Sequence, residues 1–214
     1  MTMIGFCEFS KDPIVIKCVI FDFDGVLRNW EYDLFLLDRL YGIPLDAFRE
    51  VAFAPECVGP AVRGEITDEE WRENIGQILQ KRYPDRDVGA AMEAWSSRIG
   101  ELVPEVLEII RECKTKLPVA LLSNATSKLN ADLKSLGIED LFDHVINASE
   151  IGSIKPEPEI YLQALKITGV ESHEAFFTDD RAKNVEAAAQ LGFAAHFFET
   201  PDGLRGALHD AGVL

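Results

Sequence analysis

The sequence lacks long apolar runs, and nothing in it approaches the ~18 consecutive apolar residues of a membrane-spanning helix. Near the N-terminus, Glu8, Lys11 and Asp12 interrupt the region where a signal peptide would have its apolar segment. These absences predict a protein that does not associate with membranes and that lies in the cytoplasm.

Basic residues are scarce relative to acidic ones, with 21 Lys and Arg against 37 Asp and Glu and a formal net charge of −16. Such a surface repels nucleic acid and anionic membranes, so we expect neither as a partner. It also repels phosphorylated small molecules, so a site for one of these would need a local cation. The 214 residues suffice for one sizeable α/β domain with a small inserted module.

Cysteine and histidine are also few, with four of each. The cysteines are Cys7, Cys18, Cys57 and Cys113, and they show no paired spacing of the zinc type. The histidines are not at metal-ligand spacing either. We therefore expect ordinary reduced cysteines and no functional role for the histidines.

Three short apolar runs each end in polar side chains that can carry chemistry. The runs and the residues that follow them are 19–21 with Asp22 and Asp24, 119–122 with Ser123 and Asn124, and 175–178 with Asp179 and Asp180. Short continuous apolar runs are typical of strands that are buried on both faces of a parallel sheet. Residues 144–146 and 195–198 are weaker strand candidates.

Helical patterns separate these strands. They cover residues 105–116, 127–136, 158–168 and 183–191. Strands that alternate with helices predict an α/β fold with a doubly wound, Rossmann-like parallel sheet. Ligands bind at the carboxyl ends of the strands in such sheets, and all three polar clusters fall there.

The stretch from residue 28 to residue 102 breaks this alternation. Its helical patterns cover residues 32–41, 45–51, 67–82 and 88–99, and no strand is predicted there. Thr67, followed by three acidic residues, has the form of a helix start. We therefore expect a core domain formed by residues 1–27 and 103–214, and a helical cap domain formed by residues 28–102.

Asp22 and Asp24 lie two residues apart, so they share one face of a strand. Gly25 then permits a sharp turn or a close approach to a ligand. Two carboxylates placed in this way can divide nucleophilic attack and proton transfer between them. The alternative is an acidic turn after a strand, but two acids that end a buried strand are costly to desolvate without a partner.

Asp179 and Asp180, taken alone, are typical of a solvated loop. Beside Asp22 and Asp24 they complete an oxygen-rich cluster of the kind that Mg²⁺ binds. The ion would offset the repulsion between carboxylates and hold an incoming phosphoryl oxygen. The pattern therefore predicts a magnesium cofactor and a small-molecule phosphate ester as the substrate.

Ser123, Asn124 and Lys155 can supply contacts to the phosphate. A hydroxyl and backbone N–H groups at the end of the middle strand can hold phosphate oxygens, although Ser or Asn there also suits a helix cap. Lys155 precedes Pro156, which fixes the local backbone and could aim the lysine. The ammonium group could neutralise the nucleophile and the phosphoryl group, and a surface lysine is the alternative.

These four segments, in this order, resemble the motifs of the haloacid dehalogenase superfamily. The matching segments are residues 19–27, 121–124, 155–156 and 177–185. The resemblance covers about residues 17–200, and the position of the insertion is similar to that of the helical-cap subclass. Residues 62–68 and the Asp179-Asp180 pair are also similar to sugar-phosphate phosphatases.

The resemblance implies a phosphatase of small metabolites and a role for each residue. Asp22 would be the nucleophile that forms an aspartyl-phosphate, and Asp24 would protonate the leaving alcohol and then activate water. Ser123 would bind the phosphoryl oxygens, and Lys155 would stabilise the charge.

The resemblance also implies the magnesium ligands. These would be Asp22, the backbone carbonyl of Asp24 and one acid of the last motif. When Asn184 is aligned with the final polar residue of that motif, Asp180 becomes the direct ligand and Asp179 acts through water.

Several alternatives stay open. Dehalogenases of the superfamily lack the second acid, so Asp24 favours phosphoryl chemistry, but phosphomutases share these residues. A catalytically inactive binding or scaffold protein is a third hypothesis. Arg28, Trp30, Arg63 and Trp71 could contact substrate or could serve only in packing and surface charge. The sequence does not distinguish a monomer from a homodimer.

Overall fold

Five parallel strands form the central sheet of the computed structural model, which describes residues 15–30 and 35–214. The strands are β1 (Cys18–Phe21), β4 (Val119–Ser123), β5 (His144–Asn147), β6 (Ala175–Asp179) and β7 (Ala194–Phe197). Their order in the sheet is β5-β4-β1-β6-β7. Each run that the sequence predicts as a strand is present, and its ends differ from the prediction by at most one residue.

The direction in which the strands are added reverses at β1. The chain adds β4 and β5 on one side of β1 and then crosses over to add β6 and β7 on the other side. Phe21, the last residue of β1, is paired with Leu121 of β4 and with Thr178 of β6. Ligands bind in the crevice beyond the carboxyl ends of the strands at such a reversal. The segments that follow β1, β4 and β6 therefore meet at one edge of the sheet.

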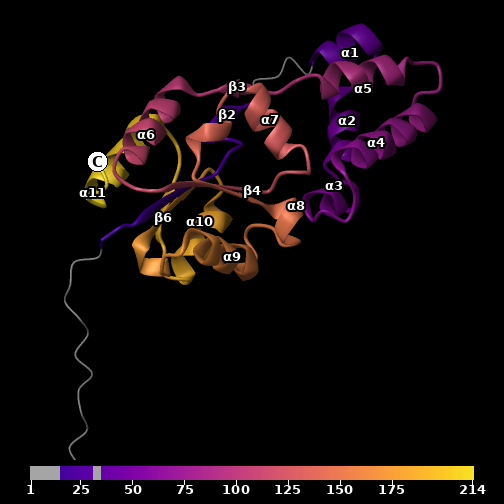
Figure 1. Cartoon of the computed structure of the whole chain (residues 1–214). Coiled ribbons are helices and arrows are strands. Elements are labelled where there is room, and N and C mark those ends of the chain that lie inside the picture. Colours follow the sequence, from indigo (N-terminus) through magenta and orange to yellow (C-terminus); the bar gives the residue numbers. More distant parts are fainter. Residues whose placement is uncertain (1–14, 31–34) are drawn as a thin grey trace, which may run out of the picture.

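Helices cover both faces of the sheet, as Figure 1 shows. One face is covered by α6 (Pro104–Lys114), α7 (Leu129–Ser135) and α11 (Pro201–Asp210). The other is covered by α8 (Ala148–Ile151), α9 (Pro158–Thr168) and α10 (Ala182–Gln190). This arrangement confirms the predicted doubly wound α/β fold.

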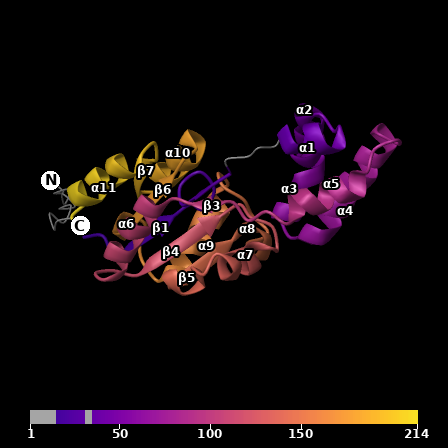
Figure 2. The same cartoon turned by 90° about the horizontal axis from the view of Figure 1, so that it is seen from above.

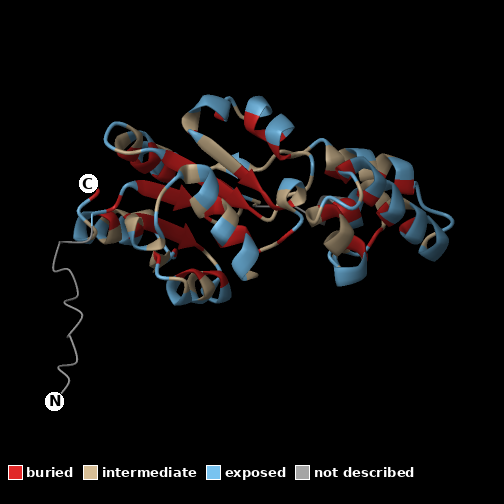
Figure 3. Ribbon diagram, turned by 60° about the horizontal axis from the view of Figure 1, so that its bottom comes forward, coloured by how far each residue is buried: buried red, intermediate tan, exposed pale blue. Residues whose placement is uncertain are grey.

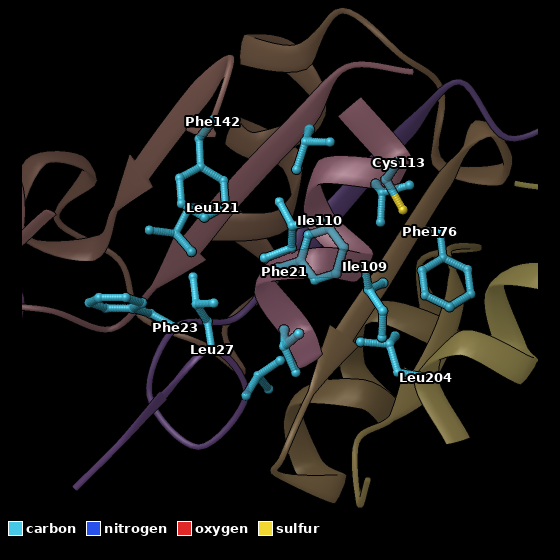
Figure 4. Close-up of a cluster of buried hydrophobic side chains, with 14 of the residues drawn as sticks. Phe21, Phe23, Leu27, Ile109, Ile110, Cys113, Leu121, Phe142, Phe176 and Leu204 are labelled. Carbon is cyan, nitrogen blue, oxygen red and sulfur yellow. The ribbon is translucent and has the colours of Figure 1, made fainter. Parts of the chain in front are cut away.

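The alternation of side chains along β1 divides the core into two clusters. Val19 and Phe21 lie in the cluster beneath α6 and α11, and Figure 4 shows Phe21 beside Ile110. Cys18 and Ile20 point to the opposite face and pack with α9 and α10. Both faces of β1, β4 and β6 are therefore buried, as the red strands in Figure 3 show, which explains why their sequences are continuously apolar.

Between β1 and β4 the chain forms a group of helices beside the sheet, which Figures 1 and 2 show from two directions. These are α1 (Phe35–Tyr41), α2 (Leu45–Ala52), α3 (Pro55–Val62), α4 (Asp68–Arg82) and α5 (Val88–Ser96), and residues 35–96 are called the helical segment below. It has its own apolar cluster, all of whose fully buried members lie between Leu37 and Trp95. The domain boundaries after residues 27 and 102 stay a prediction.

Three elements in or beside this segment differ from the prediction. The sequence predicts no strand between residues 28 and 102, but β2 (Arg28–Asn29) and β3 (Glu101–Leu102) pair in antiparallel fashion where the chain leaves and re-enters the core. Strands of two residues are too short to show a period of two. Helix α3 was not predicted because Pro60 lies inside it, and proline normally interrupts a helical pattern.

Thr67 begins α4 as predicted. Its side chain accepts a hydrogen bond from the Glu70 N–H, and the Glu70 side chain accepts one from the Thr67 N–H, which forms a capping box. The first part of the helix predicted at residues 32–41 lies outside the described residues, as do residues 1–14. Within the part of the chain that is described, no helix combines the length and the apolar character that crossing a bilayer requires. The cytoplasmic location stays a prediction.

Candidate active site

Three acidic side chains meet at the carboxyl ends of β1 and β6. Asp22 directly follows β1, Asp179 ends β6 and Asp180 comes next. One carboxylate oxygen from each of them lies within 4.8 Å of the others. Asp22 and Asp179 are only 6% and 0% exposed, and Asp180 is half-buried. The structure thus brings together three of the four acids that the sequence analysis selected.

Lys155 supplies the buried positive charge of this group. Its Nζ lies 2.7 Å from Asp22 Oδ1 and 2.7 Å from Asp179 Oδ2, and it donates a third hydrogen bond of 2.9 Å to the Leu122 carbonyl. All three ammonium hydrogens therefore have acceptors. Lys155 is 4% exposed, so the alternative of a solvated surface lysine is wrong.

Asn124 holds the backbone of this lysine. Its Nδ2 donates to the Lys155 carbonyl over 2.9 Å, and its Oδ1 accepts from the Lys155 N–H over 2.8 Å. Both polar atoms of the side chain thus bind the backbone of Lys155. Ser123 ends β4 and is buried.

The last two acids have different surroundings. The Asp179 carboxylate accepts hydrogen bonds from Lys155, from Asn184 Nδ2 at 2.9 and 3.0 Å, and from the Arg181 N–H at 2.8 Å. Asp180 Oδ1, by contrast, is buried and has no hydrogen-bond partner among the described residues. A buried acceptor without a donor is costly, and a cation would relieve that cost.

Gly25 permits the close approach of Asp180. Its φ is +91°, and a Cβ at this position would lie 2.1 Å from Asp180 Oδ2. A larger residue would have to displace the carboxylate and adopt a left-handed backbone as well. The glycine after the first acidic pair is therefore needed so that the loop after β1 and the loop after β6 can touch.

The three acids lie close together, and the single positive charge of Lys155 does not offset the effect of burial on the pKa of Asp22 and Asp180. Burial raises the pKa of Asp22 from 3.8 to about 7, an effect that Lys155 opposes and the charge of Asp179 strengthens. Burial also raises the pKa of Asp180, and the charge of Asp179 adds to the effect. The donor set fits a hard divalent cation such as Mg²⁺, because it consists of carboxylate oxygens and has one oxygen without a partner.

Asp24 does not belong to the three-acid group, since its carboxylate is bound elsewhere. Arg28 donates to it from Nε at 2.7 Å and from NH2 at 3.1 Å, and Trp30 Nε1 donates over 2.7 Å. The Arg28 guanidinium also donates to Asp132 at 2.9 Å and lies over the Phe23 ring, 4.1 Å from its centroid. Only the spacing of four between Asp24 and Arg28 could have indicated this pair from the sequence.

Two residues that were considered for substrate contact are engaged within the protein. Trp71 is 5% exposed, and its Nε1 donates to the Ala52 carbonyl inside the helical segment. Arg63 donates to both carboxylate oxygens of Glu157, over 3.1 and 2.5 Å. Glu157 was not among the predicted site residues, because no local pattern links two residues that are 94 positions apart.

Comparisons with known proteins agree with this architecture. Residues 16–192 match the haloacid dehalogenase-like hydrolase family. The chain is 40% identical over 195 residues to the chloroplastic protein Suppressor of quenching 1 of Arabidopsis thaliana, covering 81% of this chain but only 17% of that much longer protein. It is 29% identical over 184 residues to the phosphorylated carbohydrates phosphatase of Thermotoga maritima, covering 83% of this chain and 82% of that enzyme.

Solved structures show the same fold. A HAD family enzyme of Bacteroides thetaiotaomicron, crystallised with magnesium and inorganic phosphate, superposes with a TM-score of 0.69 at 23% identity and covers 86% of this chain and 94% of its own. The L-2-haloacid dehalogenase of Xanthobacter autotrophicus superposes with a TM-score of 0.66 at 22% identity, over 94% and 85% of the two chains. These structures show the shared fold, and the family match over residues 16–192 shows that the chain belongs to the haloacid dehalogenase-like hydrolases.

Proposed function

We propose that this protein is a magnesium-dependent phosphatase that hydrolyses small phosphorylated metabolites, with Asp22 as the nucleophile. The observation that carries the proposal is the position of the Asp22 carboxylate, buried at the end of the central strand between the ammonium of Lys155 and the acidic pair that follows β6. Relatives that are named as phosphatases, including one of phosphorylated carbohydrates, support this class of substrate.

Asp22, Asp180 and the backbone carbonyl of Asp24 would hold the metal ion. Asp180 suits a direct contact because its Oδ1 has no hydrogen-bond donor among the described residues, whereas the bonds of Asp179 to Lys155 and Asn184 favour a contact through water. When bound, the ion supplies positive charge that polarises the phosphoryl group and reduces its repulsion of the carboxylate.

In the first step, a carboxylate oxygen of Asp22 forms a bond to phosphorus while the bond to the leaving oxygen breaks, which gives an aspartyl-phosphate. Asp24 donates a proton to the leaving alkoxide and thereby releases the alcohol. In this role its carboxyl exchanges its hydrogen bonds to Arg28 and Trp30 for one to the substrate.

In the second step, Asp24 takes a proton from water, and the water oxygen bonds to phosphorus while the acyl-phosphate bond breaks. Inorganic phosphate leaves, and the Asp22 carboxylate is restored. Lys155 and Ser123 hold the charge and the oxygens of the phosphoryl group during both steps.

The nucleophile assignment is tested with Asp22→Asn. This change keeps the size of the side chain but removes the nucleophilic oxygen, so release of nitrophenol and of free phosphate from p-nitrophenyl phosphate with Mg²⁺ should fall to background. Asp140→Asn, at an exposed position in the turn at residues 139–141, is the matched control and should keep wild-type rates. Wild-type turnover by a pure Asp22→Asn sample would refute the assignment.

A further inference from the structure

The helical segment touches the core beside the loops that carry the site. The contacts come from the loop after α3 and from the start of α4. Thr126 donates to Asp68 Oδ1 over 2.7 Å, and the Asp68 N–H donates to Ser127 Oγ over 3.0 Å, just after the end of β4. Arg63 binds Glu157, two residues after Lys155. Helix α3 also lies next to α8, as Figure 1 shows. The contact between Arg63 and Glu157 leads directly to the catalytic lysine.

Glu157 closes the turn that contains Lys155. Its Oε2 accepts a hydrogen bond of 3.2 Å from the Ile154 N–H and one of 3.0 Å from Ser153 Oγ, so the carboxylate bridges back over the residues before the lysine. On the other side of the turn, Asn124 binds the backbone of Lys155. The direction of the lysine side chain toward Asp22 thus depends on two anchors, Asn124 and Glu157.

Arg63 binds the Glu157 anchor with both arms of its guanidinium, at 3.1 and 2.5 Å. Two parallel charge-assisted bonds fix both the distance and the orientation of the partners. The hydrogen bond from Arg63 is also the main reason why the pKa of Glu157 falls to about 2. Glu157 is therefore ionised across the neutral range and can form this pair whenever the site is in use.

The backbone next to Arg63 is fitted closely to the core. Gly64 has a φ of +72°, and a Cβ there would lie 1.9 Å from the carbonyl oxygen of Ser149 in α8. The loop after α3 therefore packs directly against the backbone of α8. Because of this contact, Arg63 meets Glu157 only when the helical segment occupies the place that it has in this structure.

We propose that Arg63 and Glu157 are positioning residues that make the placement of Lys155 depend on the docked position of the helical segment. The inference rests on the proposed function, because Lys155 is taken to act on the phosphoryl group. Docking of the helical segment completes the anchor of the catalytic lysine. Arg63 acts through Glu157 and does not contact the substrate.

A double-mutant cycle tests the coupling. Arg63→Gln and Glu157→Gln should each lower kcat for p-nitrophenyl phosphate about fivefold, which is about 1 kcal/mol, and should change KM less than twofold. The double variant should be no slower than either single variant, because both changes remove one contact. The amide oxygen introduced by Glu157→Gln can still accept from the Ile154 N–H, so this change leaves the turn itself in place.

Two further variants sharpen the comparison. Arg63→Lys keeps the charge but loses the paired bonds, and its kcat should lie between those of wild type and Arg63→Gln. Arg82→Gln breaks an arginine–glutamate pair with Glu50 that lies wholly within the helical segment, at 2.9 Å, and should leave kcat unchanged.

Hydrogen–deuterium exchange gives a readout that does not depend on turnover. In Arg63→Gln, the peptide that covers residues 152–158 should exchange about fivefold faster than in wild type, and the melting temperature should stay near the wild-type value. If wild type hydrolyses no phosphate ester, the proposed function fails, and this exchange measurement alone decides the coupling.

Three results would overturn the inference. The first is wild-type kcat and wild-type exchange in Arg63→Gln. The second is a double variant in which the two losses multiply, since independent residues behave in that way. The third is an Arg63→Gln enzyme with normal kcat whose KM rises only for substrates that carry a second anionic group, which would make Arg63 a substrate contact.

Discussion

Replacing Lys155 with methionine is the perturbation whose effect the structure defines best. The change keeps the length of the side chain and removes an ammonium that lies 2.7 Å from both Asp22 and Asp179. The side chains of the lysine and the two acids are only 2%, 8% and 0% exposed. Water therefore cannot replace the lost partner, and breaking a buried pair of this kind costs about 3–5 kcal/mol.

This cost translates into a large change in melting temperature. For a chain of this size, 1 kcal/mol corresponds to about 2–4 °C, so Lys155→Met should melt roughly 6–20 °C below wild type when EDTA removes divalent ions. Adding Asp22→Asn to Lys155→Met removes one of the unpaired charges, so the double variant should melt above the single one. Magnesium should recover part of the loss, because it binds the folded carboxylates.

Differential scanning calorimetry measures all three effects. Lys114→Met is the matched control, because Lys114 also forms a 3.0 Å pair with an aspartate, Asp143, but the two side chains are 32% and 40% exposed. That control should lose less than about 1 kcal/mol. A Lys155→Met protein that melts within about 2 °C of wild type would refute the reasoning. A double variant that melts below the Lys155→Met single variant would refute it as well.

Two further predictions concern the acids. Gly25→Ala should weaken magnesium binding in calorimetric titration, because its Cβ would lie 2.1 Å from Asp180 Oδ2 and the backbone at φ +91° adds about 1–2 kcal/mol of strain; unchanged affinity would contradict the shared site. The folded pKa of Asp22, about 7, lies above the unfolded value of about 3.9. The unfolded chain therefore binds fewer protons between about pH 4 and pH 7, so in this window the contribution of Asp22 lowers the free energy of unfolding as pH rises. In EDTA, the free energy of unfolding of Asp22→Asn relative to wild type should increase from about pH 5 to pH 8. Chemical denaturation measures this difference. A difference that stays constant over this range would contradict the raised pKa.

The parts of the site that sequence analysis could locate are those fixed by strand ends. Asp22 and Asp180 come together because the carboxyl ends of adjacent parallel strands meet at one edge, and the apolar runs before them mark β1 and β6 clearly. Lys155 follows no strand directly, and only its place beside Pro156 and the resemblance indicated it. The buried environment that gives the lysine its strength was not visible in the sequence.

The rest of the site depends on side-chain directions and long-range contacts. Asp24 lies two residues from Asp22, so a continued strand would place both on one face, but β1 ends at Phe21 and the turn at Gly25 brings Arg28 and Trp30 onto the Asp24 carboxylate. The pair of Arg63 and Glu157 joins residues that no local pattern connects. Hydrophobic periodicity reports burial, but it does not report which polar groups meet.

The pairing of β2 with β3 has a consequence for how such proteins diverge. Arg28 lies opposite Leu102, so the chain leaves the core and returns to it through neighbouring positions. The 73 residues between them, 29 to 101, form one insertion whose two ends lie side by side. Its length and shape can change through insertion, deletion or exchange while the register of β1 and β4 stays the same. The framework formed by β1, β4 and β6 can therefore stay the same while this insertion is replaced as a unit.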